Sequence, residues 1–263
     1  MPSENVVASP STDRRTRKRE ARRDHLLDLA DDLVEHHGVA GVTMAALAEA
    51  ADYAPASLYT YFPSRSALLA ALQQRALATL ADVGASSLAA WRAQLSGADP
   101  QLGALTLLWA FSDLFVAAPQ RHPREFRLQQ QLLVTPGVEE AGDAAAVVPA
   151  AMGVLDLPRR LLAEATAAGA LETAPPTDDP VGAPIDGDLL RTFAWVVALN
   201  GALLIDGLTT GAPSTGAALG AEITATLLRG WGADPSSCRA ARERAAVLAG
   251  QLDEAPGQGE TAP

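Results

Sequence analysis

The sequence has 263 residues, of which 48% are hydrophobic, 19% charged and 5% aromatic. This length is enough for one large domain or two smaller ones with a buried core, and the composition is not that of a disordered chain. The single cysteine excludes an intramolecular disulfide framework and a cysteine-based zinc site. Alanine, the best helix former, is abundant, whereas valine and isoleucine are sparse. The composition therefore favours an all-α fold over an all-β fold.

Charge is unevenly distributed along the chain, whose net charge is −11. Residues 1–75 hold nine Lys/Arg and ten Asp/Glu, whereas residues 76–263 hold eleven and twenty-one. Within the first part, the stretch from Arg14 to Arg23 carries seven positive charges and one acidic residue, Glu20. This basic arm is either a local footprint for nucleic acid or a solvated tail.

No segment of the sequence indicates secretion or membrane insertion. The first residues lack the apolar stretch of a signal peptide. The most apolar run, from Phe193 to Ile205, has thirteen residues including Asn200, and we expect it to be too short to span a bilayer. We therefore expect a cytoplasmic protein without a membrane partner.

Local signals predict the first four helices. Apolar residues at helical spacing predict a helix from Arg15 to His37, which Gly38 ends. Thr43 is a good N-cap for a short second helix. Pro55 suits the first position of a third helix, which Pro63 ends, and Ser64 can cap a fourth. Residues 1–13 are expected to form a disordered tail.

The rest of the chain is predicted to be a helical body. The expected helical spans are 65–95, 101–118, 123–134, 144–169, 188–210, 215–230 and 235–250. The four prolines and two glycines of residues 173–187 predict a mobile loop, and residues 251–263 are expected to be a disordered tail. We therefore expect a three-helix DNA-binding domain at 14–64 and a larger regulatory and dimerisation domain at 65–250.

The stretch from Thr43 to Phe62 fits two short helices joined by a four-residue turn, which is the spacing of a helix-turn-helix. Its second helix would be the recognition helix in the major groove of DNA. By spacing alone, an ordinary pair of antiparallel helices in a helical protein is equally compatible.

The local sequence distinguishes these two interpretations. Residues 47–51 (Leu-Ala-Glu-Ala-Ala), residues 57–65 (Ser-Leu-Tyr-Thr-Tyr-Phe-Pro-Ser-Arg) and residues 67–69 (Ala-Leu-Leu) resemble the TetR/AcrR family of transcriptional regulators. The resemblance covers about residues 20–80. It implies a helix-turn-helix domain that binds double-stranded DNA, joined to a helical body that dimerises and binds a small molecule.

The resemblance also implies which residues contact DNA. Tyr59 matches a tyrosine of the family pattern, and several small residues match positions that face bases. Helix N-termini and the arginines of the arm would bind phosphate or the minor groove, and Tyr61 would either reach phosphate or pack in the core. The expected DNA contacts are Arg15, Arg17, Thr43, Met44, Ala45, Pro55, Ala56, Ser57, Tyr59, Thr60, Tyr61 and Arg65.

The sequence departs from the family pattern at four positions. Asp52 replaces a glycine, but aspartate tolerates left-handed turn geometry. Tyr53 replaces a valine, and Ala54 replaces the serine that caps the recognition helix, so that cap is lost. Arg65 replaces a lysine and adds a fork that can bind phosphate through two hydrogen bonds.

Two regions of the body are candidates for dimerisation and ligand binding. The span 188–210 is apolar nearly all round, and with 215–230 it could form a dimeric four-helix bundle; the alternative is a central core helix. Residues expected to line a ligand site, or else to pack in the core, are Trp91, Trp109, Phe111, Phe115, Phe126, Trp195 and Asn200.

Enzyme chemistry has little support. Three of the four histidines lie in the first predicted helix, and nucleotide-binding and zinc-protease motifs are missing. We expect no cofactor, no metal and no catalytic residue. The sequence predicts a homodimeric regulator, most often a repressor in this family, that an unknown small apolar effector releases from a palindromic operator. The alternative is a helical scaffold protein that has lost DNA binding.

Overall fold

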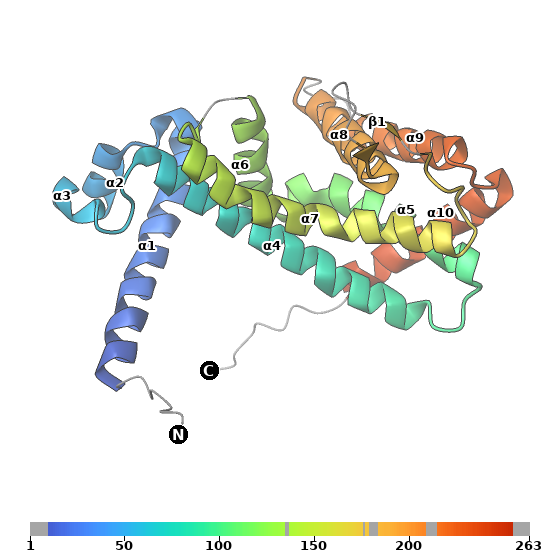
Figure 1. Cartoon of the computed structure of the whole chain (residues 1–263), viewed down its shortest axis with the longest axis horizontal. Helices are drawn as coiled ribbons and strands as arrows, with labels where there is room; N and C mark the ends of the chain where they lie inside the picture. Colours follow the sequence, from blue (N-terminus) through green and yellow to red (C-terminus); the bar gives the residue numbers. More distant parts are fainter. Residues whose placement is uncertain (1–9, 135–136, 176, 179–183, 209–214, 255–263) are drawn as a thin grey trace. The chain divides into compact units, whose positions relative to one another are not determined.

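Helices make up most of the chain (Figure 1). In this computed structural model the described residues are 10–134, 137–175, 177–178, 184–208 and 215–254. The helices are α1 (Pro10–Gly41), α2 (Met44–Ala50), α3 (Pro55–Leu58), α4 (Arg65–Gln94), α5 (Pro100–Arg121), α6 (Pro123–Val134), α7 (Ala141–Ala167), α8 (Gly187–Leu208), α9 (Thr215–Gly230) and α10 (Pro235–Glu254). The predicted all-α class is confirmed.

A two-residue antiparallel ladder lies within the predicted mobile loop 173–187. Strand β1 (Thr177–Asp178) pairs with β2 (Pro184–Ile185), with Thr177 opposite Ile185. Residues 176 and 179–183 of that loop lie outside the described residues. The loop prediction is therefore corrected at the four paired positions.

Several predicted boundaries differ from the structure. The third helix was expected to continue to Pro63, but α3 has four residues and is followed by a turn in which the Tyr61 N–H donates to the Leu58 carbonyl at 2.8 Å. Residues 10–13 and 251–254 are helical rather than parts of tails, because a helix that has already formed extends into polar sequence at little cost. The remaining tail residues, 1–9 and 255–263, lie outside the described part.

Capping side chains fix several helix starts. The Thr43 hydroxyl accepts the Ala46 N–H at 3.0 Å, and the Asp99 carboxylate accepts the Leu102 N–H at 2.9 Å. Asp234 caps α10 in the same way, and the hydrogen bonds from the Ser236 hydroxyl and from Ser237 lower the pKa of its carboxyl to about 2. These local hydrogen bonds explain why the starts of α2, α5 and α10 could be located within one residue.

The chain divides into two compact units, and α4 and α7 contribute to both. Unit 1 comprises residues 1–77 and 124–151, and unit 2 comprises residues 78–123 and 152–263. This division differs from the predicted boundary after residue 64. The first turns of α4 and one turn of α6 complete the core of unit 1, whose most buried side chains include Leu26, Leu47, Leu58, Phe62, Leu68, Leu69, Leu72 and Leu128.

The core of unit 2 is formed by α5, α8, α9 and α10 with the later turns of α4 and α7. Its largest buried side chains are those of Trp91, Trp109 and Trp195. Beside them, the Trp195 indole N–H donates to the Thr224 hydroxyl at 3.0 Å, and the Thr224 hydroxyl lies 2.7 Å from the Ser112 hydroxyl.

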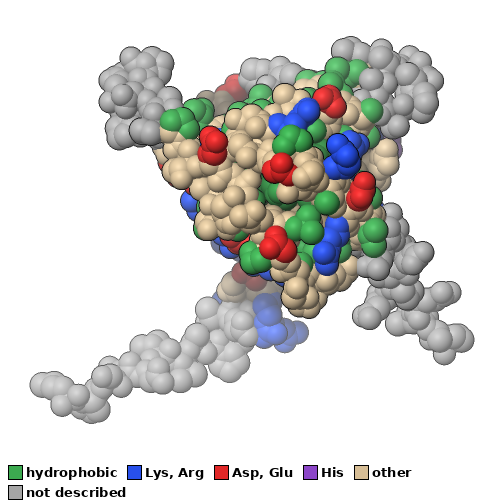
Figure 2. Space-filling view, turned by 90° about the vertical axis from the view of Figure 1, so that its right-hand side faces the viewer, with side chains coloured by type: hydrophobic (Ala, Val, Ile, Leu, Met, Phe, Trp, Pro, Cys, Tyr) green, Lys and Arg blue, Asp and Glu red, His purple; other side chains and the backbone are tan. Residues whose placement is uncertain are grey.

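On the face shown in Figure 2, acidic and basic side chains alternate with hydrophobic ones and do not form one charged patch.

Three helices of the described chain are long and apolar enough, by length and composition, to cross a membrane: Pro100–Arg121, Ala141–Ala167 and Gly187–Ile205. The expectation that no segment reaches this length is therefore wrong. It rested on the longest uninterrupted apolar run, whereas isolated polar residues hardly lower the mean hydropathy of an alanine-rich and leucine-rich helix. In α5, half of the most apolar 18-residue stretch is buried inside the structure.

Candidate nucleic-acid interface

The helix-turn-helix is formed by α2, the turn at 51–54 and α3. Val42 and Leu47 are both fully buried at the two positions that flank the Thr43 cap, which fixes the entry of the chain into α2. Asp52 adopts a positive φ of 54°, so the predicted left-handed turn is present. Ala54 makes no side-chain cap hydrogen bond to α3, as its sequence predicted.

Most of the residues expected to touch DNA are exposed on α2, α3 and the turn after α3. This exposed set is Thr43, Ala45, Pro55, Ala56, Ser57, Tyr59 and Thr60. Tyr59 is the largest residue of this set, and 52% of it is accessible. Met44 and Tyr61 are half-buried and pack against the core of unit 1, so the structure gives Tyr61 a packing role. Tyr53 also packs on this core with its ring half-buried.

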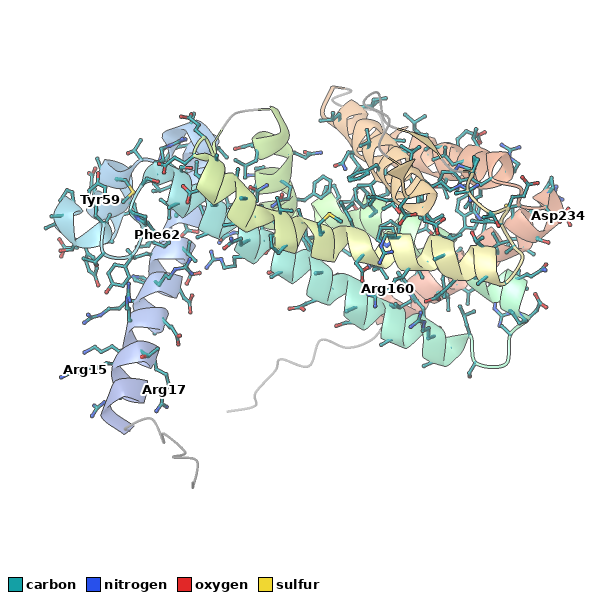
Figure 3. All side chains as sticks on the ribbon, viewed as in Figure 1. Arg15, Arg17, Tyr59, Phe62, Arg160 and Asp234 are labelled. Carbon is teal, nitrogen blue, oxygen red and sulfur yellow. The ribbon has the colours of Figure 1, made fainter. Side chains whose placement is uncertain are left out.

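The basic arm is part of a helix, because α1 runs without interruption through residues 10–37. Arg15 and Arg17 project from its N-terminal half, and Tyr59 lies on the helix-turn-helix (Figure 3). Arg19 donates to the Thr60 carbonyl at 3.0 Å, and the guanidinium of Arg23 lies 5.2 Å from the centre of the Phe62 ring. These two contacts fix the arm against the end of the recognition helix. The sequence did not predict them, because nothing local marks their partners.

Charge is segregated along α1. The N-terminal half carries the seven cations of the arm, whereas the C-terminal half carries several aspartates and glutamates. Arg75 of α4 pairs with Asp28 at 2.7 Å and with Asp31, and Arg124 of α6 pairs with Asp32 at 3.1 Å and with Glu35. Burial raises the pKa of Asp31 although Arg75 opposes this shift. The acidic half of α1 is thus compensated within unit 1, and the basic half remains exposed.

Arg65 makes contacts that the sequence did not predict. Its Nε donates to the Val42 carbonyl at 2.6 Å and one terminal nitrogen donates to the Val39 carbonyl at 2.7 Å. The fork therefore holds the backbone that links α1 to α2. The expected Arg65 contact with phosphate stays a prediction.

A hollow of about 430 Å³ lies between the basic arm and the helix-turn-helix. Arg22 forms one side of it, and Asp52, Ser57, Thr60 and Tyr61 are among the residues on the other. Its lining combines one cation, hydroxyl groups, the turn backbone and one carboxylate, that of Asp52. The cation, the hydroxyl groups and the backbone N–H groups can donate hydrogen bonds to phosphate oxygens.

The residues expected to line a ligand site lie mainly in the core of unit 2. Trp91, Trp109 and Trp195 are each at most 2% exposed, and the Phe111 ring lies 5.1 Å from that of Trp195 and 6.1 Å from that of Phe115. Two others do not join this cluster. Phe126 belongs to unit 1, and Asn200 donates to the Val196 carbonyl of its own helix at 3.0 Å.

Two of these tryptophans have unsatisfied polar groups. The indole N–H groups of Trp91 and Trp109 are buried, and within the described residues neither has an acceptor. A buried donor without an acceptor costs roughly 1–3 kcal/mol. No group of three His, Cys, Asp or Glu side chains that could hold a metal ion is found among the described residues.

The exposed helix-turn-helix and its docked basic arm define a DNA-binding domain. Residues 26–72 match the family described as bacterial regulatory proteins, tetR family. The resemblance to the TetR/AcrR family is thus confirmed, and this part of the chain is a TetR-family DNA-binding domain. No curated protein matches the sequence significantly.

Solved structures share the fold of about four fifths of the chain or more. SmeT, the repressor of the multidrug efflux pump SmeDEF of Stenotrophomonas maltophilia, is 18% identical, with 80% of this chain and 89% of that chain covered and a TM-score of 0.54. RolR with resorcinol is 22% identical, with coverages of 88% and 95% and a TM-score of 0.52. FadR of Bacillus subtilis with stearoyl-CoA is 13% identical, with coverages of 78% and 97% and a TM-score of 0.52. At these identities the likeness shows the fold.

Proposed function

We propose that the chain is a dimeric transcriptional regulator, a repressor that a small apolar ligand releases from double-stranded DNA. The observation that carries the proposal is the TetR-family match over residues 26–72, on a unit whose helix-turn-helix face is exposed. The protein would act in the cytoplasm on a palindromic operator, and the proposal includes no catalytic activity.

The composition of the face suggests how DNA would be read. Besides Tyr59, the exposed part of the recognition element offers hydrogen-bonding side chains at Ser57 and Thr60, and its other exposed residues are Pro55 and Ala56. Small side chains suit contact with thymine methyl groups and shape recognition more than paired hydrogen bonds to guanine. Affinity would then come mainly from the basic arm, through phosphate and minor-groove contacts.

The exposed face of α8 supports a homodimer. Leu190, Phe193, Val197 and Leu204 are 41%, 41%, 66% and 51% exposed, and their spacing of three, four and seven residues aligns them on one side of the helix. The opposite side, with Trp195 and Leu199, is fully buried. Helix α9 packs against α8. A second copy that covered this stripe would form the proposed four-helix bundle.

The core of unit 2 supports a ligand site. SmeT has been solved with triclosan, RolR with resorcinol and FadR with stearoyl-CoA, and each of these molecules has a substantial apolar part. In this chain the unpaired N–H groups of Trp91 and Trp109 could donate to an oxygen of such a molecule. The proposed ligand is therefore an apolar compound that carries at least one hydrogen-bond acceptor.

Fluorescence anisotropy tests the proposal. A labelled duplex from the region upstream of the protein's own gene is titrated with protein across a series of salt concentrations, and a duplex of the same composition in shuffled order is the control. We expect tighter binding to the native duplex and a linear fall of log affinity with log salt. Equal binding to both duplexes, or none to either, would contradict the proposal and favour the scaffold alternative.

A further inference from the structure

A pocket in unit 2 lies away from the tryptophan cluster of the core. It has a volume of about 460 Å³ and is formed by residues 172–175, α8 and the junction between α9 and α10. Leu190, Ala194, Leu227 and Trp231 give it apolar walls, and Arg191 contributes a cationic side chain to its lining. Pockets of about 300–1,000 Å³ with apolar walls and a few polar groups are typical of small-molecule sites.

Arg191 is buried, with 9% of the residue exposed. One terminal nitrogen donates to the Glu172 carbonyl at 2.7 Å, and the guanidinium carbon lies 5.5 Å from the centre of the Trp231 ring. No carboxylate of the described residues pairs with it. Arginine is almost never this buried unless it is paired, because a desolvated charge is costly. Among the described residues, Arg191 therefore has no ion-paired carboxylate, although Glu172, whose carbonyl it binds, also lines the pocket.

The pocket wall is held in place by close packing. The Glu172 N–H donates to the Trp231 carbonyl at 2.8 Å, and this backbone hydrogen bond connects residues on two sides of the pocket. A Cβ on Gly187 would lie 2.6 Å from the Cβ of Ala174, and Gly232, with a φ of 96°, lies directly against the Glu172 side chain. Glycines at these two positions let residues 172–175 lie close to the start of α8 and to the segment between α9 and α10.

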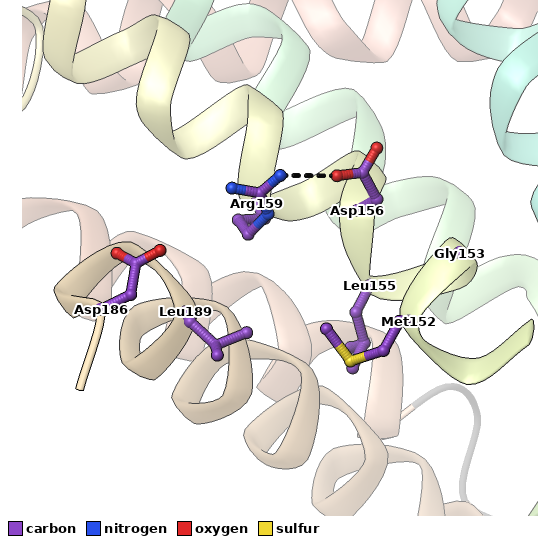
Figure 4. A pocket seen from close by; sticks show the side chains of 7 residues that line it. All are labelled: Met152, Gly153, Leu155, Asp156, Arg159, Asp186 and Leu189. Atoms are coloured by element: carbon purple, nitrogen blue, oxygen red, sulfur yellow. Dashed lines mark hydrogen bonds and ion pairs between the residues drawn. The ribbon is translucent and has the colours of Figure 1, made fainter. Parts of the chain in front are cut away.

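A neighbouring pocket contains an arginine that is paired with a carboxylate (Figure 4). Arg159 lines that pocket and pairs with Asp156, one turn earlier on α7, at 2.8 Å. Asp186 lies across the same pocket and adds a second negative charge near it. Both arginines line pockets of similar size, but only Arg159 has a carboxylate partner within the described residues.

We propose that the Arg191 pocket binds a small organic monocarboxylate with an apolar body. The carboxylate would accept hydrogen bonds from the planar guanidinium, whose fork matches carboxylate geometry. The apolar body would lie against Leu190, Leu227 and the Trp231 ring. The inference concerns binding to the free protein, so it does not depend on DNA binding and can fail or succeed independently of the proposed function.

Isothermal titration calorimetry on the full chain without DNA tests this inference. The probes are octanoate, its neutral counterpart octanamide, and inorganic phosphate. We expect saturable octanoate binding, at least tenfold weaker octanamide binding, and weaker phosphate binding because phosphate leaves the apolar walls uncovered. Equal affinities for octanoate and octanamide would overturn the role of the charge, and no octanoate binding would overturn the site.

Substitutions test whether octanoate binds in the Arg191 pocket. Arg191→Gln should weaken octanoate at least tenfold, and Arg191→Lys should retain part of the affinity. The matched control is Arg229→Gln, which removes an exposed charge on α9 that pairs with Glu222. Unchanged octanoate affinity in folded Arg191→Gln, judged by circular dichroism, would contradict the proposal.

A second measurement does not depend on the folding of that variant. Bromo-octanoate should quench tryptophan fluorescence in the native chain, because the proposed ligand lies against Trp231. Trp231→Phe should abolish most of this quenching when bromo-octanoate is added at a concentration that saturates the variant. Quenching that persists in Trp231→Phe would place the carboxylate beside the core tryptophans and would overturn the assignment.

Discussion

Arg65, which the sequence predicted to contact DNA, makes hydrogen bonds within the fold. Its two hydrogen bonds reach the carbonyls of Val39 and Val42 in the segment that links α1 to α2. Arg65→Lys cannot span both acceptors, and we expect the midpoint of thermal unfolding to fall by an amount equivalent to about 1–2 kcal/mol. Arg92→Lys is the control, because its partner Glu164 is an exposed carboxylate. An equal destabilisation of both variants would mean that Arg65 has no special role.

Asp113 gives a pH-dependent test of the α5–α10 contact. Burial raises the pKa of its carboxyl, and the nearby Arg242, which also lies 5.2 Å from the Trp109 ring, only partly opposes this. A carboxyl whose pKa is raised by folding destabilises the fold once it ionises. Asp113→Asn should therefore raise the unfolding midpoint at neutral pH, and the gain should disappear as pH falls below the unfolded pKa of about 4.

Thermal melts of both proteins between neutral and acidic pH measure this difference. The control is Asp82→Asn, at an exposed position of α4, which should change the midpoint little at any pH. A gain of the same size throughout the pH range would exclude ionisation of Asp113 as its cause.

A substitution at Tyr59 distinguishes a phosphate contact of its hydroxyl from a packing role of its ring. With 52% of the residue exposed, its hydroxyl is available to DNA, whereas Tyr53 packs half-buried on the core. Tyr59→Phe should weaken operator binding by on the order of 1 kcal/mol per half-site. Tyr53→Phe is the matched control and should bind as the native chain does. A footprinting titration compares the three, and unchanged affinity in Tyr59→Phe would leave that hydroxyl without a role.

At the scale of elements, the basic arm can be shortened to test how much its charge contributes to DNA binding. Removing residues 1–18 deletes four cations of the arm and leaves the Arg19 contact with Thr60 intact. The slope of log affinity against log salt should then become shallower by roughly 0.9 for each phosphate that the deleted cations neutralise. Affinity itself should fall, because only three cations of the arm, Arg19, Arg22 and Arg23, remain beside the helix-turn-helix. An unchanged slope would show that the four deleted cations do not neutralise phosphates.

The sequence predicts elements better than it predicts their partners. Thr43, Asp52, Pro55 and Gly38 act through their own backbone and neighbours, so the helix-turn-helix could be located from the sequence alone. Other features depend on distant atoms. The acceptors of Arg65, the docking of Arg19 and the burial of Arg191 arise only when segments meet in space, and no local pattern announces them.

At the scale of the whole molecule, Gly201 distinguishes self-association from folding. A Cβ added there meets nothing within 4 Å, and the position is exposed, so we expect Gly201→Leu to be accommodated inside one chain. Leucine is also the better helix former, by roughly 0.8 kcal/mol. The variant should therefore melt no lower as a monomer, yet dissociate more readily if α8 faces a second copy.

Analytical ultracentrifugation across a concentration series measures that dissociation. Val197→Ala, on the same exposed stripe, removes apolar surface without adding bulk and should weaken the dimer less. A native chain that sediments as a monomer at micromolar concentration would contradict the dimer.

The sharing of α4 between the two units limits what can be cut from this protein. Leu68, Leu69 and Leu72 of α4 and Leu128 of α6 are at most 1% exposed in the core of unit 1. A fragment that stopped before α4 would expose the apolar surface that these leucines cover, and a fragment that stopped after α4 would still lack α6. The DNA-binding unit is therefore not a transplantable module. Its autonomous folding needs two separate stretches of sequence, so gene fusions that carry only the helix-turn-helix should yield insoluble protein.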